Sequence, residues 1–217
     1  MQDKASRRLV IVIHDPGRPE GLDIARGIAR RAGERLAKEG LSIGVEVEVI
    51  SLLEQERSSI SGGDIVYGLF LARGGHWQTI EDYTTRQGAI LAGKPEPSRL
   101  GAILSPMVGD CSRVSVIYWP AKRYKERHYN DTLEFARSIA GTGRQLELIE
   151  ARRLAEAKGC IVIAAMMPGR LIDRALQYGK KPRIPYILSS DSVVDYIVNN
   201  IVVKTVEAHS RIATATR

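Results

Sequence analysis

The sequence has 217 residues, of which 44% are hydrophobic, and 32 basic against 25 acidic side chains give it a net charge of +7. This length can bury a sizeable core in one large domain or two small ones. No apolar run is long enough for a membrane span or for the apolar part of a signal peptide. We therefore expect a soluble, cytoplasmic protein with no membrane partner.

The charge and the cysteine content narrow the possible partners and sites. A positive net charge favours an anionic partner such as nucleic acid, an acidic membrane surface, or a polycarboxylate or phosphate ligand, although a solvated basic surface would explain it equally well. The two cysteines, Cys111 and Cys160, form no C-x-x-C motif. We therefore expect two buried thiols rather than a disulfide framework or a zinc site.

The first half of the chain alternates predicted strands and helices. A compact apolar run, RLVIVIH, predicts a buried strand that ends at an Asp-Pro-Gly turn. Apolar residues at helical spacing then predict an amphipathic helix, which Gly40 stops. The predicted strands are 8–14, 45–50, 64–72 and 99–104, and the predicted helices are 21–38 and 77–91, the second ended by Gly93.

The second half repeats this alternation. Its predicted strands are 113–119, 146–149, 160–167 and 186–188, and its predicted helices are 129–140, 171–178 and 191–208. Strands that alternate with helices predict parallel sheets with helices on their faces.

The two halves also align as text, which indicates an internal duplication. LVIVIHDPGRPEG aligns with VSVIYWPAKRYKE, and DIVYGLFLARGG aligns with CIVIAAMMPGR. The sequence therefore predicts an α/β protein of two similar Rossmann-like lobes, residues 1–110 and 111–217, each a parallel sheet flanked by helices. Because the strand at 99–104 leaves no room for a closing helix before 113, the first lobe should lack a terminal helix that the second has.

Two of the four histidines stand where a ligand site is expected. His14 ends the first predicted strand, and His76 follows the third across the turn Arg73-Gly74-Gly75. Ligands of open parallel sheets bind outside the carboxyl ends of the strands, and the first and third strands are commonly neighbours there. We therefore expect the two imidazoles to face one cleft.

An imidazole pair suits a divalent cobalt, nickel, iron or zinc ion. It does not complete a structural zinc site, which has four protein ligands. The nearest carboxylates in the sequence are Asp15, Glu81 and Asp82, as ligands or as hydrogen-bond partners of the imidazoles.

His14 and the segment FLARGGHWQTIED resemble the small sirohydrochlorin-type metal chelatases, which are the cobalt, nickel and iron chelatases of the cobalamin, F430 and sirohaem pathways. In that family one strand ends in a Gly-His-Gly-like turn. A Phe-Leu-rich strand is followed by a glycine turn, a histidine and a nearby acidic residue. The resemblance covers residues 8–104, whereas the second half matches only in its order of elements and its apolar blocks.

The sequence also departs from the family pattern. The first motif lacks its flanking glycine, and two extra residues separate His76 from the acidic pair. The second half has Tyr118 or Trp119 in place of His14, and Gly169-Arg170 in place of Gly75-His76. The family includes single-lobed dimers and two-lobed monomers. The resemblance therefore implies a two-lobed, chelatase-like monomer, or a dimer of such monomers, with the histidine pair in one lobe.

The resemblance implies a lyase that inserts a divalent metal into sirohydrochlorin or a related tetrapyrrole. Cobalt is the first choice of metal, with nickel or iron as alternatives; the metal is a substrate, and no cofactor stays permanently bound. His14 and His76 would be catalytic and, with Glu81 and Asp82, would bind the metal. The basic side chains would bind the carboxylates of the anionic macrocycle, because guanidinium groups bind carboxylates in bidentate fashion. The residues expected to bind it are Arg18, Arg73, Tyr118, Trp119, Lys122 and Arg170.

Three other functions compete with this one. A non-catalytic tetrapyrrole- or metal-binding relative would need the same histidines. Nucleic acid ranks lower as a partner, because the basic residues are spread along the chain and only residues 118–129 mix aromatic with basic side chains. A nucleotide enzyme ranks last, because neither G-x-G-x-x-G nor a P-loop is present.

Overall fold

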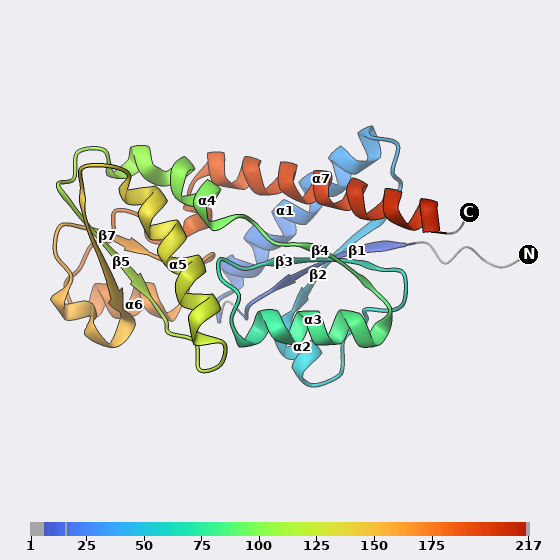
Figure 1. The fold of residues 1–217 in the computed structure, drawn as a ribbon, viewed down its shortest axis with the longest axis horizontal. Coiled ribbons are helices and arrows are strands. Elements are labelled where there is room, and N and C mark those ends of the chain that lie inside the picture. Colours follow the sequence, from blue (N-terminus) through green and yellow to red (C-terminus); the bar gives the residue numbers. More distant parts are fainter. Residues whose placement is uncertain (1–6, 16, 216–217) are drawn as a thin grey trace, which may run out of the picture.

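The computed structural model describes residues 7–15 and 17–215, with side chains to residue 211. It contains two parallel sheets flanked by helices, which confirms the predicted fold class (Figure 1). Among the described residues, no helix is both long and apolar enough to cross a membrane.

The first sheet has the strand order β2-β1-β3-β4, and all neighbouring strands are parallel. The central strands β1 and β3 are covered on both faces, which explains their continuous apolar runs. The edge strand β2 alternates valine with glutamate; Glu46 is exposed, whereas Glu48 is buried and accepts a hydrogen bond from the Ser59 hydroxyl. The strands span Arg8–Ile13 (β1), Gly44–Val49 (β2), Ile65–Leu69 (β3) and Ile90–Gly93 (β4).

Helices cover both faces of this sheet (Figure 1). Leu9, Ile11 and Ile13 of β1 pack toward α1 and α7, and the alternate residues Val10 and Val12 pack toward α2 and α3. This alternation follows from the two-residue period of a strand. The four helices span Pro19–Lys38 (α1), Ile50–Glu54 (α2), Gly75–Gln87 (α3) and Asp191–Ala215 (α7).

The second sheet has the order β6-β5-β7, and Ile184 adds a parallel bridge to Val162 beside β7. This order is the same as that of the first sheet, as the proposed duplication requires. The strands are Arg113–Tyr118 (β5), Gln145–Glu150 (β6) and Cys160–Ile163 (β7), and the helices are Pro97–Leu104 (α4), Lys125–Ala140 (α5) and Arg170–Gln177 (α6). Short 3₁₀ segments span Ser105–Val108 (η1), Ala151–Glu156 (η2) and Ile187–Ser189 (η3).

Helices α4 and α7 are exchanged between the two halves of the chain. Helix α4 belongs to the first half but packs on α5 of the second, and α7 belongs to the second half but packs on α1 and β4 of the first (Figure 1). One continuous apolar cluster consequently runs through both halves. The division near residue 110 lies between η1 and β5, and it stays a prediction about chain organisation, since neither half closes its own core.

The predicted strand at 99–104 is wrong, because these residues form α4. The fourth strand is Ile90–Gly93, which begins within the last two residues of the predicted helix 77–91. Gly88 has φ 66°, a left-handed conformation that suits glycine and ends α3 one residue earlier. The first half of the chain therefore has a terminal helix, contrary to the prediction, although this helix packs on the second half. In the second half, 187–189 form η3 rather than a strand, and the sheet is extended by Ile184.

The cysteine prediction is also wrong, because Cys111 and Cys160 form a disulfide with a Cα–Cα distance of 6.0 Å. Strands β5 and β7 pair in parallel with Val114 opposite Cys160, so the segment leading into β5 passes beside the start of β7. Sequence spacing could not reveal this proximity, because the two cysteines are 49 residues apart.

We predict that Gly101→Ala destabilises the protein by about 1–3 kcal/mol. A Cβ at this position of α4 would lie 2.5 Å from the carbonyl oxygen of Phe135 in α5. Gly27→Ala in α1 is the matched control, because its added Cβ meets nothing within 4 Å. It should stabilise the protein by about 0.5–1 kcal/mol. Urea unfolding measures both, and equal effects would contradict the close packing of α4 on α5.

We also predict that replacing Cys111 and Cys160 by serine lowers the free energy of unfolding by about 2–4 kcal/mol, because the disulfide restricts the unfolded chain. Urea denaturation under non-reducing conditions measures the loss. The wild-type protein, denatured without a reductant, should react with no thiol reagent. Two reactive thiols in that sample would show that the disulfide is not formed.

Candidate functional site

The structure brings His14 and His76 into contact, with ring centroids 4.8 Å apart and an interplanar angle of 76°. His14 directly follows β1, and His76 is the second residue of α3, the helix after β3. Strands β1 and β3 are neighbours, and the chain leaves β1 toward β2 on one side and later joins β3 on the other. The pair therefore lies at the topological switch point of the sheet, where ligands of open α/β sheets bind.

Hydrogen bonds at Nδ1 fix the tautomer that each imidazole has in its neutral form. His14 Nδ1 lies 2.8 Å from the carbonyl oxygen of Asp15, and His76 Nδ1 lies 2.8 Å from Oε1 of Glu54. Both partners only accept hydrogen bonds, so each Nδ1 carries the proton. Each Nε2 then keeps a lone pair, and neither forms a hydrogen bond with any residue that the structure describes. The two Nε2 atoms can accept a proton or bind a metal ion.

Glu54 is a residue of the candidate site that the sequence prediction missed. It is the last residue of α2, which follows β2, so three neighbouring strands contribute side chains to one edge of the sheet. A carboxylate that accepts the Nδ1 proton fixes the orientation and the tautomer of the ring. The prediction considered carboxylates near the histidines in sequence, whereas the useful signal was that Glu54 follows the strand next to β1.

Glu81 and Asp82, predicted as metal ligands, do not join the histidine pair. Glu81 accepts a hydrogen bond from Trp77 Nε1 at 2.7 Å, and Asp82 accepts one from Gln78 Nε2 at 2.8 Å. Both bonds run along α3 between residues four apart, where helical side chains meet. Among the described residues, no group of three or more histidine, cysteine or acidic side chains is placed to hold a metal ion.

Arg73, predicted to bind substrate, instead joins the two lobes through Asp131 of α5. Its Nη2 and Nε lie 2.8 Å and 3.0 Å from the two carboxylate oxygens, and Lys94 Nζ lies 3.4 Å from the same carboxylate. Burial alone would raise the pKa of Asp131, but the hydrogen bonds from Arg73 and the charge of Lys94 hold it below its ordinary value. Burial lowers the pKa of Lys94, and Asp131 opposes that shift.

Further contacts show that the carboxyl edges of the two sheets face each other. Arg18, at the start of α1, forms an ion pair with Asp173 of α6. At Gly74, a Cβ would lie 3.1 Å from the ring of His128 in α5. Arg18, beside the predicted cleft, is therefore already paired with Asp173. The absence of a side chain at Gly74 lets the loop after β3 approach α5 closely.

The second lobe presents aromatic and basic side chains at its own carboxyl edge. Tyr118 is buried, with its ring centroid 6.3 Å from that of His128, and both line a hollow of about 280 Å³ beside β5 and α5. Burial lowers the pKa of His128, which favours the neutral form of this ring. Trp119 is 48% exposed, and the guanidinium of Arg174 lies 5.8 Å from its ring centroid.

The other two residues predicted to bind substrate, Lys122 and Arg170, are both exposed. Arg170 is the first residue of α6, and Lys122 lies in the loop between β5 and α5. Neither side chain is paired with a residue that the structure describes, so both charges remain available to an anion.

No known protein family and no curated protein matches the sequence. A solved structure of the XylFII-LytSN complex is similar, with 13% identity over 90% of this chain and 85% of that chain and a TM-score of 0.43. This similarity is too weak to assign a function.

We predict that Asp131→Asn destabilises the protein by about 2 kcal/mol at pH 7, less than the usual cost of breaking a buried ion pair because Arg73 is partly exposed. Since the pKa of Asp131 is lower in the folded state, its charge stabilises the fold above the ordinary aspartate pKa of 3.8. That contribution is lost as the pH falls through the folded pKa. The difference between variant and wild type should therefore shrink below about pH 4.

Urea unfolding between pH 3 and 7 measures this dependence. Asp195→Asn is the control, because Asp195 forms a solvent-exposed ion pair with Arg31 between α7 and α1. Its loss should cost less than about 1 kcal/mol. Equal losses in the free energy of unfolding of the two variants at pH 7 would show that Asp131 stabilises the protein no more than an exposed ion pair does.

Proposed function

We propose that this protein is a chelatase that inserts a divalent metal ion into sirohydrochlorin or a related tetrapyrrole. Cobalt is the first choice, with nickel or iron as alternatives. The observation that carries the proposal is the contacting pair His14 and His76, whose Nδ1 atoms are both engaged and whose Nε2 atoms are both open. Such a pair at a switch point suits a reaction that needs a metal ligand and a proton acceptor together.

The chemistry requires two exchanges. The metal ion loses water ligands and enters the ring, and the ring loses two pyrrole N–H protons, so that M²⁺ is taken up and two H⁺ are released. Nε2 of either histidine can hold the ion on arrival or take a proton. A site with two imidazoles and no completed set of four protein ligands binds the ion loosely enough to pass it on.

Glu54 has a positioning role in this proposal. Its hydrogen bond to Nδ1 of His76 holds the ring in one orientation. When Nε2 takes a pyrrole proton, the carboxylate stabilises the imidazolium that results. We therefore assign proton acceptance to His76, whose partner is a carboxylate, and the first contact with the ion to His14, whose partner is a neutral carbonyl.

The second lobe supplies the groups that bind the macrocycle. Lys122 and Arg170 are exposed and unpaired within the described structure, so they can bind its carboxylates, and Trp119 offers an exposed aromatic face. Arg18 can join them by exchanging Asp173 for a substrate carboxylate. Arg73 is not among the groups proposed to bind the macrocycle, because its guanidinium is hydrogen-bonded to Asp131.

The proposal includes a cytoplasmic location and a two-lobed monomer, or a dimer of such monomers. Together with a cytoplasmic location, the disulfide favours a hyperthermophilic source organism. Stable disulfides are rare in cytoplasmic proteins except in hyperthermophilic archaea and bacteria.

We predict that His76→Ala reduces metal insertion by about 100-fold or more, the usual size of a general acid–base contribution, with little loss of tetrapyrrole affinity. Glu54→Gln should reduce insertion less and displace its pH profile. Arg170→Ala should weaken tetrapyrrole binding by about 5- to 150-fold, which corresponds to 1–3 kcal/mol for a charged hydrogen bond, and leave metal binding intact. Absorbance with sirohydrochlorin and each metal measures insertion, and fluorescence quenching measures binding.

The control is Arg57→Gln, which removes an exposed cation near α2. Wild-type protein that binds metal and macrocycle but does not join them would be a non-catalytic relative. If His76→Ala abolished only macrocycle binding and Arg170→Ala only metal binding, the division of labour between the lobes would be refuted. Wild-type protein that binds neither would overturn the proposed function.

A further inference from the structure

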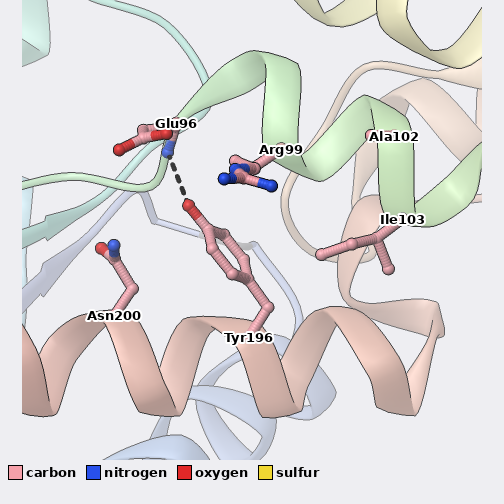
Figure 2. A pocket seen from close by; sticks show the side chains of 6 residues that line it. All are labelled: Glu96, Arg99, Ala102, Ile103, Tyr196 and Asn200. Carbon is pink, nitrogen blue, oxygen red and sulfur yellow. Dashed lines mark hydrogen bonds between the residues drawn. The ribbon is translucent and has the colours of Figure 1, made fainter.

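A second candidate site lies between α4 and α7, the two exchanged helices. The hollow there has a volume of about 520 Å³ and is open to solvent. It shares no residue with the histidine pair or its hydrogen-bond partners. It is lined by Glu96, Arg99, Ala102, Ile103, Tyr196 and Asn200 (Figure 2).

The hydrogen bonds around this hollow leave donors free to meet a ligand. The buried Tyr67 donates its hydroxyl proton to Asn200 Oδ1 at 2.8 Å, so the amide NH₂ of Asn200 remains free. Burial raises the pKa of Tyr67 well above its ordinary value, which keeps this donor protonated. The hydroxyl oxygen of Tyr196 accepts a bond from the backbone N–H of Glu96 at 3.3 Å, so the Tyr196 proton is also free to donate (Figure 2).

Two opposite charges border the same hollow without neutralising each other. Glu96 precedes the first turn of α4 and Arg99 lies in that turn. The two side chains form no ion pair with each other or with any other described residue. Both lie close enough to act on Tyr196: burial is the main cause that raises its pKa, the negative charge of Glu96 adds to this, and the positive charge of Arg99 opposes it.

We propose that this hollow binds a free α-amino acid. The donors of Arg99, Tyr196 and Asn200 match a carboxylate, since a guanidinium binds it in bidentate fashion and the other two groups each have a donor that no described residue uses. Glu96 matches the ammonium group. A simple anion would meet the charge of Glu96 and a simple cation that of Arg99, so only a zwitterion satisfies both. Ala102, Ile103 and the Tyr196 ring offer apolar surface to a side chain.

The occupant would touch one helix from each half of the chain. Because α4 packs on the second lobe and α7 on the first, binding here would fix the relative position of these helices. The site stands apart from the proposed chelatase function, so either can fail while the other holds.

Titration calorimetry of the full chain with each of the twenty common amino acids tests the proposal. At least one should bind saturably below about 10 mM. Its analogue without the ammonium group and its analogue without the carboxylate should each bind at least about tenfold more weakly, the cost of losing a charge-assisted hydrogen bond. No saturable binding, or equal binding of either analogue, would overturn the proposal.

Variants then test the residues. Arg99→Gln and Glu96→Gln should each weaken binding at least about tenfold, and Tyr196→Phe should weaken it less. Arg57→Gln, which removes an exposed cation on the opposite side of the first sheet, should bind as wild type does. Thermal unfolding without ligand shows whether each variant is folded. Wild-type affinity in folded Arg99→Gln or Glu96→Gln would refute the assigned contacts.

Discussion

The arrangement of the two lobes depends on the buried carboxylate of Asp131. This side chain is 2% exposed, and it lies on α5 of the second lobe while its partners Arg73 and Lys94 come from the first. A buried charge without partners would cost several kcal/mol, so the three groups must stay together. They hold the loops after β3 and β4 against α5, and the loop after β3 leads directly into His76. The contact that joins the lobes thus also positions one half of the candidate site.

The exchange of α4 and α7 has a related consequence. A glycine at position 101 lets α4 approach the α5 backbone, and α7 lies along α1 and the first sheet. Each lobe is therefore covered by a helix from the other half of the chain, and the apolar core is continuous. Relative movement of the lobes must shift these helices against each other. Such a movement would change the shape of the hollow between α4 and α7.

The sequence predicted those features that local pattern and parallel-strand geometry determine. Apolar runs identified β1, β3, β5 and β7, and the rule that parallel strands end at one edge placed His14 beside His76. It misassigned 90–91 and 99–104 because Gly88 and Gly93 are both acceptable helix stops and LGAIL suits either a strand or a helix. It missed Glu54, the disulfide and the commitment of Arg73 to Asp131, because each depends on contacts between distant segments that no local pattern encodes.

The two lobes differ because different residues stand at equivalent positions of two sheets that have the same strand order. In the first lobe, the residue after β1 is His14, whose exposed ring meets His76. In the second, Tyr118 ends β5 with its side chain buried beside His128, and the exposed Trp119 follows. A buried phenol and an exposed indole offer no strong metal ligand, whereas an indole face and neighbouring guanidinium groups can contact a flat, anionic molecule. Since the two edges face each other, a ligand held between them would meet imidazole nitrogen on one side and aromatic and cationic surface on the other.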